Sequence, residues 1–346
     1  MRFLILFLTR RCNARCRSCF YAGHLNDGSE EMTLEQYERL ADSAGSFSNL
    51  LFSGGEPSLR QDAPRIASAF YRRCSIRHLG FPTNGLLPGR ALESVERILA
   101  ECPDLKVDLN VSLDGLGEAH DRIRGVPGNF VRAEETLRRA AELRRCCPRF
   151  RVNVETVIAN ANAREIPRLL DYVWTHHEVD GHYAEVIRGN PPDAALRPPG
   201  RWRLWLAHRA VLRNHRRYRA RSARGPSGFE LAAIGRMYRL QRQFLRRGSW
   251  PFPCVAGRTI AAIEPTGEAR LCELKGVVGR LEDFDWDLRR LLDSEAAQAA
   301  RQEIADSHCA CTHCVFAFES LLDDPRRAAP LFARGDRLDR RRAKPR

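Results

Sequence analysis

The feature that most constrains the fold is a regular alternation of short apolar runs with helical segments through the first half of the chain. This alternation is typical of a parallel sheet whose strands are joined by right-handed helical crossovers. Six strand–helix units, rather than the eight of a closed barrel, predict an α/β fold with a partial, open (β/α)6 TIM-like barrel. The expected strands are residues 3–8, 49–52, 76–82, 105–113, 150–158 and 182–187, and the expected helices are residues 33–44, 62–73, 91–100, 130–145 and 163–176.

Unusual polar and glycine-rich sequences follow the first four of these strands. In barrels of this kind the chemistry lies at the carboxyl ends of the strands, so we expect these sequences to meet at one end of the sheet. They are the cysteine loop of residues 11–21, then Gly54-Gly55-Glu56-Pro57, Thr83-Asn84-Gly85 and Ser112-Leu113-Asp114-Gly115.

The loop after the first strand carries Cys12, Cys16 and Cys19 in the spacing Cys-x3-Cys-x2-Cys. Three thiolates hold three irons of a four-iron, four-sulfur cluster and leave the fourth iron free for another ligand. A zinc site would need a fourth ligand close by, and His24 is the only local candidate. Disulfides are disfavoured because the chain has no secretory signal. The spacing therefore favours an iron–sulfur cluster.

The cysteine spacing, followed by Gly54-Gly55-Glu56-Pro57, resembles the radical S-adenosylmethionine (SAM) superfamily. The resemblance implies that the methionyl amine and carboxylate of SAM chelate the open iron. It also implies that one electron cleaves SAM to a 5′-deoxyadenosyl radical, which takes hydrogen from a substrate. Ser18 departs from the family, where an aromatic residue or His often precedes the third cysteine, and Phe20 or Tyr21 is expected to pack on the adenine instead.

The resemblance also assigns SAM-binding roles at the strand ends. The Gly-Gly-Glu-Pro run would hold the methionyl amine of SAM. Ser112 and Asp114 would contact its ribose and methionine parts. Arg124 would bind the SAM carboxylate, which suits the fork of a guanidinium group. The alternatives are an ordinary turn for the glycines, a turn cap for Ser112 and Asp114, and a solvated surface side chain for Arg124. Glu185, near the end of the sixth strand, is expected to pair with an arginine. The SAM-binding set is Phe20, Gly54, Gly55, Glu56, Pro57, Thr83, Asn84, Ser112, Asp114 and Arg124.

A second set of cysteines lies near the C-terminus. Residues 260–271 are typical of a β-hairpin with its turn at 265–267, which would bring Cys254 and Cys272 together. The pattern Cys-x12-Gly-x4-Cys resembles the opening of SPASM and twitch domains, which bind auxiliary iron–sulfur clusters, and the cysteine number implies one such cluster. Structural zinc is the alternative. The candidate ligands are Cys254, Cys272, Cys309, Cys311 and Cys314, with Cys311 and Cys314 preferred and Cys309 or His313 as the spare.

The net charge of +14 is concentrated in two segments. Residues 201–247 hold fourteen arginines against the single acid Glu230, and residues 326–346 are also strongly basic. The first segment predicts two helices that dock apolar stripes on the open side of the barrel. The basic side chains are interpreted first as a solvated face, in a chain that uses arginine as its main basic residue. The alternative is a rim for an anionic partner, such as a phosphorylated sugar, an acidic peptide or peripheral contact with a membrane. Nucleic acid is a minor possibility because no RNA-reading motif accompanies the charge.

These observations divide the chain into a barrel of residues 1–190, an arginine-rich segment 191–250, a cluster domain 251–325 and a disordered basic tail 326–346. No stretch approaches the ~20 apolar residues of a membrane span, and the cytoplasm is the expected location. We expect a radical SAM enzyme that uses a flavodoxin or ferredoxin as reductant. Its substrate would be a small molecule, glycan-related or a peptide, and oxidation and C–X bond formation both stay open. The alternatives are a peptide- or protein-maturing radical SAM enzyme, or a non-catalytic iron–sulfur protein that binds RNA or a partner.

Overall fold

The computed structural model describes residues 1–343 and has a curved parallel sheet at its centre. Six strands pair in parallel in chain order, which confirms the partial barrel. Residues 4–9 of the first strand are buried, since helices cover one face of the sheet and the barrel interior covers the other. The strands are β1 (Phe3–Thr9), β2 (Asn49–Gly54), β3 (His78–Thr83), β4 (Lys106–Ser112), β5 (Phe150–Ile158) and β6 (Gly181–Val186).

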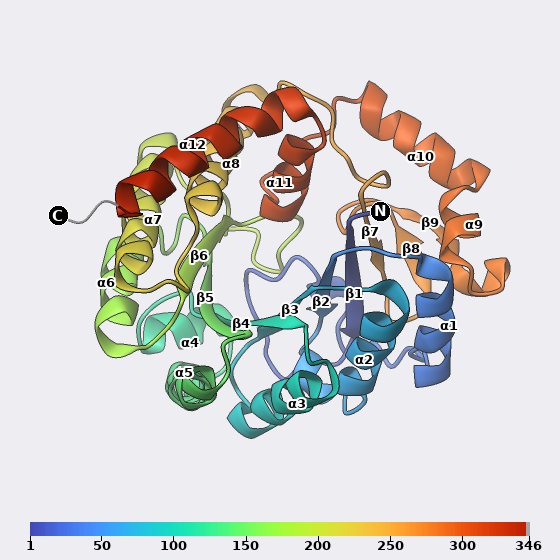
Figure 1. The fold of residues 1–346 in the computed structure, drawn as a ribbon, viewed down its shortest axis with the longest axis horizontal. Coiled ribbons are helices and arrows are strands. Elements are labelled where there is room, and N and C mark those ends of the chain that lie inside the picture. The colour runs from blue at the N-terminus through green and yellow to red at the C-terminus, as the bar shows by residue number, and fades with distance from the viewer. Residues whose placement is uncertain (344–346) are drawn as a thin grey trace.

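The crossover helices lie on the outer face of this sheet (Figure 1). The first of them begins at a capping box in which Thr33 and Gln36 each accept a hydrogen bond from the other's backbone. The helices are α1 (Leu34–Ala44), α2 (Ala63–Cys74), α3 (Pro88–Glu101), α4 (Glu118–Arg124), α5 (Asn129–Cys146) and α6 (Ile166–His176), and short 3-10 helices span Ala22–His24, Pro57–Leu59 and Leu281–Phe284.

The sheet continues past the first strand into the C-terminal part of the chain. β7 (Ile260–Ile263) pairs in parallel with the free edge of β1, and β8 (Glu268–Arg270) and β9 (Val277–Arg280) follow antiparallel. The predicted hairpin is confirmed, and its turn is closed by a 3.0 Å hydrogen bond from the Gly267 amide to the Glu264 carbonyl. The C-terminal cysteine region therefore extends the barrel sheet to nine strands.

The arginine-rich segment forms two long antiparallel helices, α7 (Arg201–Arg221) and α8 (Gly228–Arg247). α7 packs on α6 and β6, and α8 packs on α7 (Figure 1). Each helix buries an apolar stripe, represented by Tyr218 on the first and Tyr238 on the second. The predicted docking of these helices on the barrel is therefore observed.

None of the helices within the described residues is long and apolar enough to cross a lipid bilayer.

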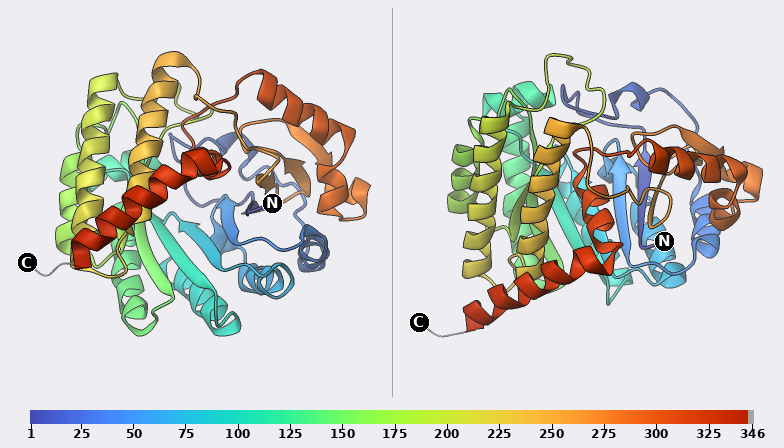
Figure 2. Two further views of the ribbon diagram at one scale, coloured as in Figure 1. Left: turned by 45° about the horizontal axis from the view of Figure 1, so that its top comes forward. Right: turned by 90° about the horizontal axis from the view of Figure 1, so that it is seen from above.

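The C-terminal residues 325–343 form a helix, α12 (Pro325–Ala343), where the sequence predicted a disordered tail. α12 crosses α8 (Figure 2) and buries Leu331 against the core. Gly335 allows the close approach, because a Cβ there would lie 2.8 Å from the Phe229 amide nitrogen. The segment was predicted to be disordered because its many arginines outnumber the few apolar residues that form its narrow buried stripe. Before it come α9 (Leu288–Leu292), α10 (Glu295–Asp306) and α11 (Cys314–Leu322).

We predict that Gly335→Ala lowers the free energy of unfolding by about 1–3 kcal/mol, because the new methyl group must push α12 away from the α8 backbone. Gly235→Ala on α8 is the matched control. Its Cβ would have only a Leu212 side-chain atom at 3.9 Å, so that change should be neutral or stabilise by roughly 0.4–1 kcal/mol. Thermal and urea unfolding measure both, and an unchanged Gly335→Ala protein would show that α12 does not pack on α8.

Candidate active site

The cysteine loop and the glycine-rich sequences meet at the carboxyl ends of the strands, in a cavity of about 460 Å³. All three loop cysteines line this cavity, together with nine of the ten residues predicted to bind SAM. Those nine are Phe20, Gly54, Gly55, Glu56, Pro57, Thr83, Asn84, Ser112 and Arg124.

Gly54 and Gly55 bring the end of β2 against the start of the cysteine loop. The Gly55 amide donates a 2.7 Å hydrogen bond to the Thr9 carbonyl, and the Glu56 amide donates a 2.9 Å bond to the Arg11 carbonyl. A Cβ at Gly55 would lie 2.1 Å from that Arg11 oxygen, and Gly54 has φ +103°. Side chains are therefore excluded at both positions by the loop itself, a reason that sequence inspection did not supply.

The Glu56 side chain joins β2 to β3. Its buried carboxylate accepts hydrogen bonds from the Ser58 hydroxyl at 2.7 Å, the Thr83 hydroxyl at 2.9 Å and the Asn84 amide nitrogen at 2.7 Å. Burial raises the pKa of Glu56, and these donors oppose the shift. The Asn84 side chain in turn donates a 2.8 Å bond to Asn13 of the cysteine loop. The ends of β2 and β3 and the loop thus form one hydrogen-bonded unit.

Arg124, at the end of α4, points at the cysteine loop. Its Nη1 lies 3.7 Å from the Cys16 sulfur, and its Nε lies 2.8 Å from a carboxylate oxygen of Asp114. Burial alone would lower the pKa of Arg124, but Asp114 and Cys16 outweigh it and the pKa is raised. Asp114 was predicted to contact SAM, and the structure instead places it behind Arg124, fully buried, outside the cavity lining. There it pairs with Arg124 and accepts a 2.8 Å hydrogen bond from the Val157 amide.

The loop thiols lie in a setting that suits metal ligation. Burial raises the pKa of Cys12 to about 12 and also raises that of Cys19, which Arg124 and Arg188 lower in turn. None of the three is in a disulfide, and all face one cavity. Burial outweighs the guanidinium groups, so a cluster would displace protons from these thiols when it binds. The residues present therefore fit a cluster-binding loop.

Sequence reasoning missed a charged group on the far wall of the cavity. Arg188, just after β6, pairs with Glu185 and donates bonds of 3.0 and 2.8 Å to Glu273, and its guanidinium stacks on Phe20 at 4.6 Å. Glu273 also lies 2.9 Å from His313. Burial would raise the pKa of Glu273, but His313 and Arg188 outweigh it and lower the pKa to about 2. The expected pairing of Glu185 with an arginine is confirmed. Glu273 had no signal beyond lying beside Cys272, and His313, which the spacing offered as a spare cluster ligand, faces Glu273 instead.

Glu155 on β5 is a second missed group in the cavity. Burial, and next the negative charge of Glu185, raise its pKa to about 7, although Arg188 and Arg124 oppose the shift. A carboxyl group with a pKa near 7 can both bind and release a proton at neutral pH. Its position in the middle of a strand gave no sequence signal.

The C-terminal cysteines divide into two sets. Cys254, Cys272, Cys309 and Cys311 lie near enough for their charges to act on one another's pKa. Cys314 instead accepts a 3.2 Å hydrogen bond from Gln241 and faces Glu185 and Arg188. Within residues 1–343, no three His, Cys, Asp or Glu side chains are arranged to hold a single metal ion.

Comparison with known proteins identifies the barrel. Residues 6–173 match the family model described as the radical SAM superfamily. This part of the chain is a radical SAM domain. The superfamily is the one that the cysteine spacing and the Gly-Gly-Glu-Pro run predicted, and its members use a four-iron cluster and SAM.

Three curated relatives each match about half of the chain. Fe-coproporphyrin III synthase of Methanosarcina barkeri is 32% identical over 169 residues, which are 47% of this chain and 39% of the relative. Pre-heme d1 synthase of Dinoroseobacter shibae is 32% identical over 199 residues, with coverage of 54% and 46%. GTP 3′,8-cyclase of Stenotrophomonas maltophilia is 31% identical over 176 residues, with coverage of 49% and 51%. The chain thus spans about half or less of the length of these relatives.

Solved structures share the fold over most of the chain. A structure of anSMEcpe with bound AdoMet and a peptide has a TM-score of 0.62 at 16% identity and covers 89% of this chain and 83% of its own. Streptococcus suis SuiB bound to S-adenosylmethionine has a TM-score of 0.61 at 16% identity, with coverage of 86% and 67%. At this identity the likeness shows the fold.

We predict that Glu155 makes the stability of the protein depend on pH near neutrality. A carboxyl whose folded pKa of about 7 exceeds its unfolded value of ~4.3 contributes stability at low pH, and that contribution is lost as the pH rises from about 4.5 to 7. Wild type should therefore lose on the order of 1–3 kcal/mol over this range relative to Glu155→Gln.

The measurement is the difference in thermal midpoint between wild type and Glu155→Gln at pH 5, 6, 7 and 8. Glu118→Gln, at a highly exposed position of α4, is the control and should follow wild type at every pH. Parallel profiles for wild type and Glu155→Gln would show that Glu155 has an ordinary pKa.

Proposed function

We propose that the protein is a radical SAM enzyme that modifies its substrate by hydrogen abstraction inside the barrel cavity. In this proposal Cys12, Cys16 and Cys19 hold a four-iron, four-sulfur cluster, and SAM lies between the cluster and the strand ends. When bound, the cluster supplies the electron that cleaves SAM to methionine and the hydrogen-abstracting 5′-deoxyadenosyl radical. The observation that carries the proposal is that the three thiols, the Gly54–Glu56 turn and Arg124 all face one cavity.

The residues of the chain have distinct parts in this proposal. Arg124, held by Asp114 and lying 3.7 Å from the Cys16 sulfur, offers a guanidinium to the SAM carboxylate beside the cluster. Glu56 binds the ends of β2 and β3 together and fixes the turn against which the methionyl amine would lie. Phe20, stacked under Arg188, closes the cavity on the side of the cysteine loop. The protein thereby orients the cofactor and keeps water from the reacting atoms.

Glu155 is the cavity group suited to proton transfer. Its pKa of about 7 allows the carboxylate to accept a proton from a substrate as hydrogen is removed. Thr156 and Val157 continue its strand along the same cavity, so the carboxyl lies where substrate is expected.

We also propose that the C-terminal region holds one auxiliary iron–sulfur cluster. We infer that its ligands are Cys254, Cys272, Cys309 and Cys311, because these four thiols lie near enough to act on one another's pKa, whereas the Cys314 sulfur accepts a hydrogen bond from Gln241. The spacing had instead favoured Cys314 over Cys309. Glu273, next to Cys272, reaches the cavity and pairs with Arg188, so this site is in direct contact with the substrate side of the barrel.

The names of the relatives indicate several different classes of substrate. Relatives are named Fe-coproporphyrin III synthase and GTP 3′,8-cyclase, and SuiB of similar fold has been solved with the precursor peptide SuiA. We propose a small-molecule, glycan-related or peptide substrate whose reacting part fits the 460 Å³ cavity beside SAM. A flavodoxin or ferredoxin would supply the electron.

Reconstituted protein should convert SAM to 5′-deoxyadenosine under anaerobic conditions with dithionite, and Cys16→Ala should abolish the product, because two thiolates do not hold the cluster. Product is measured by liquid chromatography. Cys146→Ala, which removes an exposed thiol far from the loop in sequence, is the control and should keep wild-type yield. Equal yield from Cys16→Ala and wild type would contradict the proposal.

The auxiliary ligand set is tested in protein that already lacks Cys12, Cys16 and Cys19. We expect this variant to retain the iron and sulfide of one cluster after anaerobic reconstitution. Adding Cys309→Ala should remove most of that iron, whereas adding Cys314→Ala should leave it within about a fifth of the parent value. Loss of iron in the Cys314 variant but not in the Cys309 variant would reverse the assignment.

A further inference from the structure

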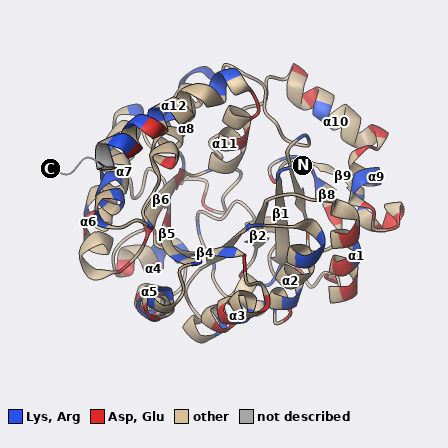
Figure 3. Cartoon of the chain, in the orientation of Figure 1, with Lys and Arg blue, Asp and Glu red and all other residues tan. Residues whose placement is uncertain are grey.

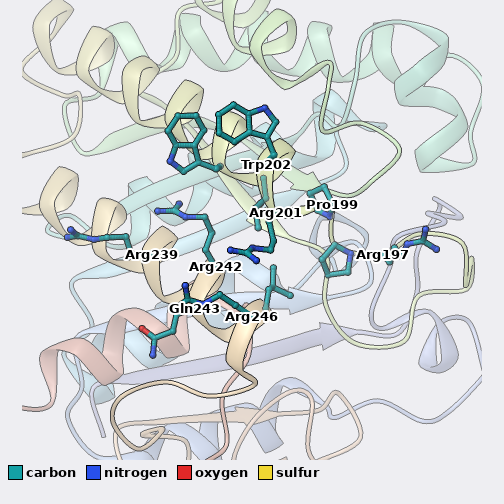
Figure 4. A pocket seen from close by; sticks show the side chains of 13 residues that line it. Arg197, Pro199, Arg201, Trp202, Arg239, Arg242, Gln243 and Arg246 are labelled. Carbon is teal, nitrogen blue, oxygen red and sulfur yellow. The ribbon is translucent and has the colours of Figure 1, made fainter.

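A second cavity lies outside the barrel, between the beginning of α7 and the end of α8 (Figure 4). Its volume is about 970 Å³. No acidic side chain lines it, and we call it the arginine groove after the five residues Arg197, Arg201, Arg239, Arg242 and Arg246 in its wall.

The positive charges of the arginine groove lack partners in the described chain. Arginines further along α7 form ion pairs with carboxylates: Arg217 pairs with Asp171, and Arg219 pairs with Asp339. Within residues 1–343, none of the five groove arginines pairs with an acidic side chain. Burial, and next the charge of neighbouring arginines, lower the pKa of Arg239 and Arg242. Positive charge therefore gathers in a concave site without compensation, in a region where most of the charged positions are Lys or Arg (Figure 3).

The position of Arg242 is fixed by its neighbours. Its Nη1 lies 2.9 Å from Nδ1 of His208, and the His208 ring stacks on Tyr238 at 4.0 Å. Burial lowers the pKa of His208 well below its ordinary value, so the imidazole is neutral and accepts the hydrogen bond. The guanidinium keeps its remaining donors for the groove, into which Figure 4 shows Arg201 and Arg242 pointing.

Two indole rings flank these arginines. Trp202 is 67% exposed and stacks on Trp205, with ring centroids 4.7 Å apart and planes at 20°. Arg209 stacks on Trp205 at 4.6 Å, so the free aromatic face belongs to Trp202. An exposed indole can stack on a flat, uncharged ring, and the guanidinium groups beside it can bind an anionic group attached to that ring.

The first turn of α7 adds hydrogen-bond donors. Its N-cap, Gly200, offers no side-chain cap, and no acidic residue lies in the first turn. The backbone amides there are free to bind an anion together with Arg201.

The groove lies at the same end of the sheet as the mouth of the barrel cavity, because α7 follows the carboxyl end of β6. The loop before α7 also contacts the cysteine loop, where Arg17 pairs with Asp193. The right-hand view in Figure 2 shows this loop at that end of the sheet.

We propose that the arginine groove binds an organic phosphate of the nucleoside diphosphate class, with the phosphates among Arg201, Arg242 and the first turn of α7 and the ring on Trp202. A diphosphate concentrates several negative charges in a volume that five guanidinium groups surround, and arginine binds phosphate through paired hydrogen bonds. The concave shape favours a small ligand over a flat membrane surface. The proposal does not depend on the radical chemistry of the barrel.

The test is calorimetric titration of the full-length, cluster-reconstituted protein with uridine diphosphate, inorganic pyrophosphate and hexaglutamate. We expect both phosphate probes to bind, and Arg201→Gln/Arg242→Gln to weaken each at least tenfold. Arg213→Gln/Arg216→Gln removes the same charge from exposed positions of α7 outside the groove and should change affinity less than twofold. Trp202→Ala should weaken uridine diphosphate several-fold and leave pyrophosphate unchanged. Thermal midpoints verify that each variant is folded.

Three results would overturn the proposal. The first is no binding of either phosphate probe to wild type. The second is an equal loss of affinity in the two double variants, which would mean attraction by overall charge alone. The third is tighter binding of hexaglutamate than of both phosphate probes, which would make the groove a site for acidic peptides.

Discussion

The structure depends on the close approach of two backbone turns to the cysteine loop. A Cβ at Gly55 would lie 2.1 Å from the Arg11 carbonyl oxygen, and one at Gly125 would lie 2.3 Å from that of Arg15. The loop is thus held from one side by the end of β2 and from the other by the end of α4. Such contacts tolerate no side chain, so the spacing between glycines and cysteines is a consequence of packing as much as of ligand binding. They leave all three thiols facing one cavity.

The barrel cavity and the outer helices differ in the charge of their side chains. Carboxylates at Glu155, Glu185 and Glu273 face Arg188 inside the barrel, and this group connects the barrel wall to the C-terminal cysteines. The surplus of positive charge lies instead on α7, α8 and α12, outside the barrel (Figure 3). The lining of the cavity therefore holds more acidic than basic side chains, whereas the arginine groove is strongly cationic.

Much of this architecture could be predicted from the sequence, because the patterns that indicate it lie within short segments of the chain. Apolar runs predicted all six barrel strands, and the turn at residues 265–267 predicted the hairpin. The carboxyl ends of parallel strands must meet, which was enough to bring Gly54, Thr83 and Ser112 to the cysteine loop. The pairing of Arg188 with Glu273, the position of Asp114 behind Arg124 and the packing of α12 depend on segments far apart in the chain. No local pattern encodes them.

The central claim is that the loop thiols hold a cluster with one open iron that faces SAM. Electron paramagnetic resonance of the reduced protein tests it most directly, in a variant without Cys254, Cys272, Cys309 and Cys311, so that the loop cluster alone contributes. The account predicts a reduced four-iron signal whose g-values shift when SAM is added. A signal that SAM leaves unchanged would contradict it, because the open iron would then not face the cavity.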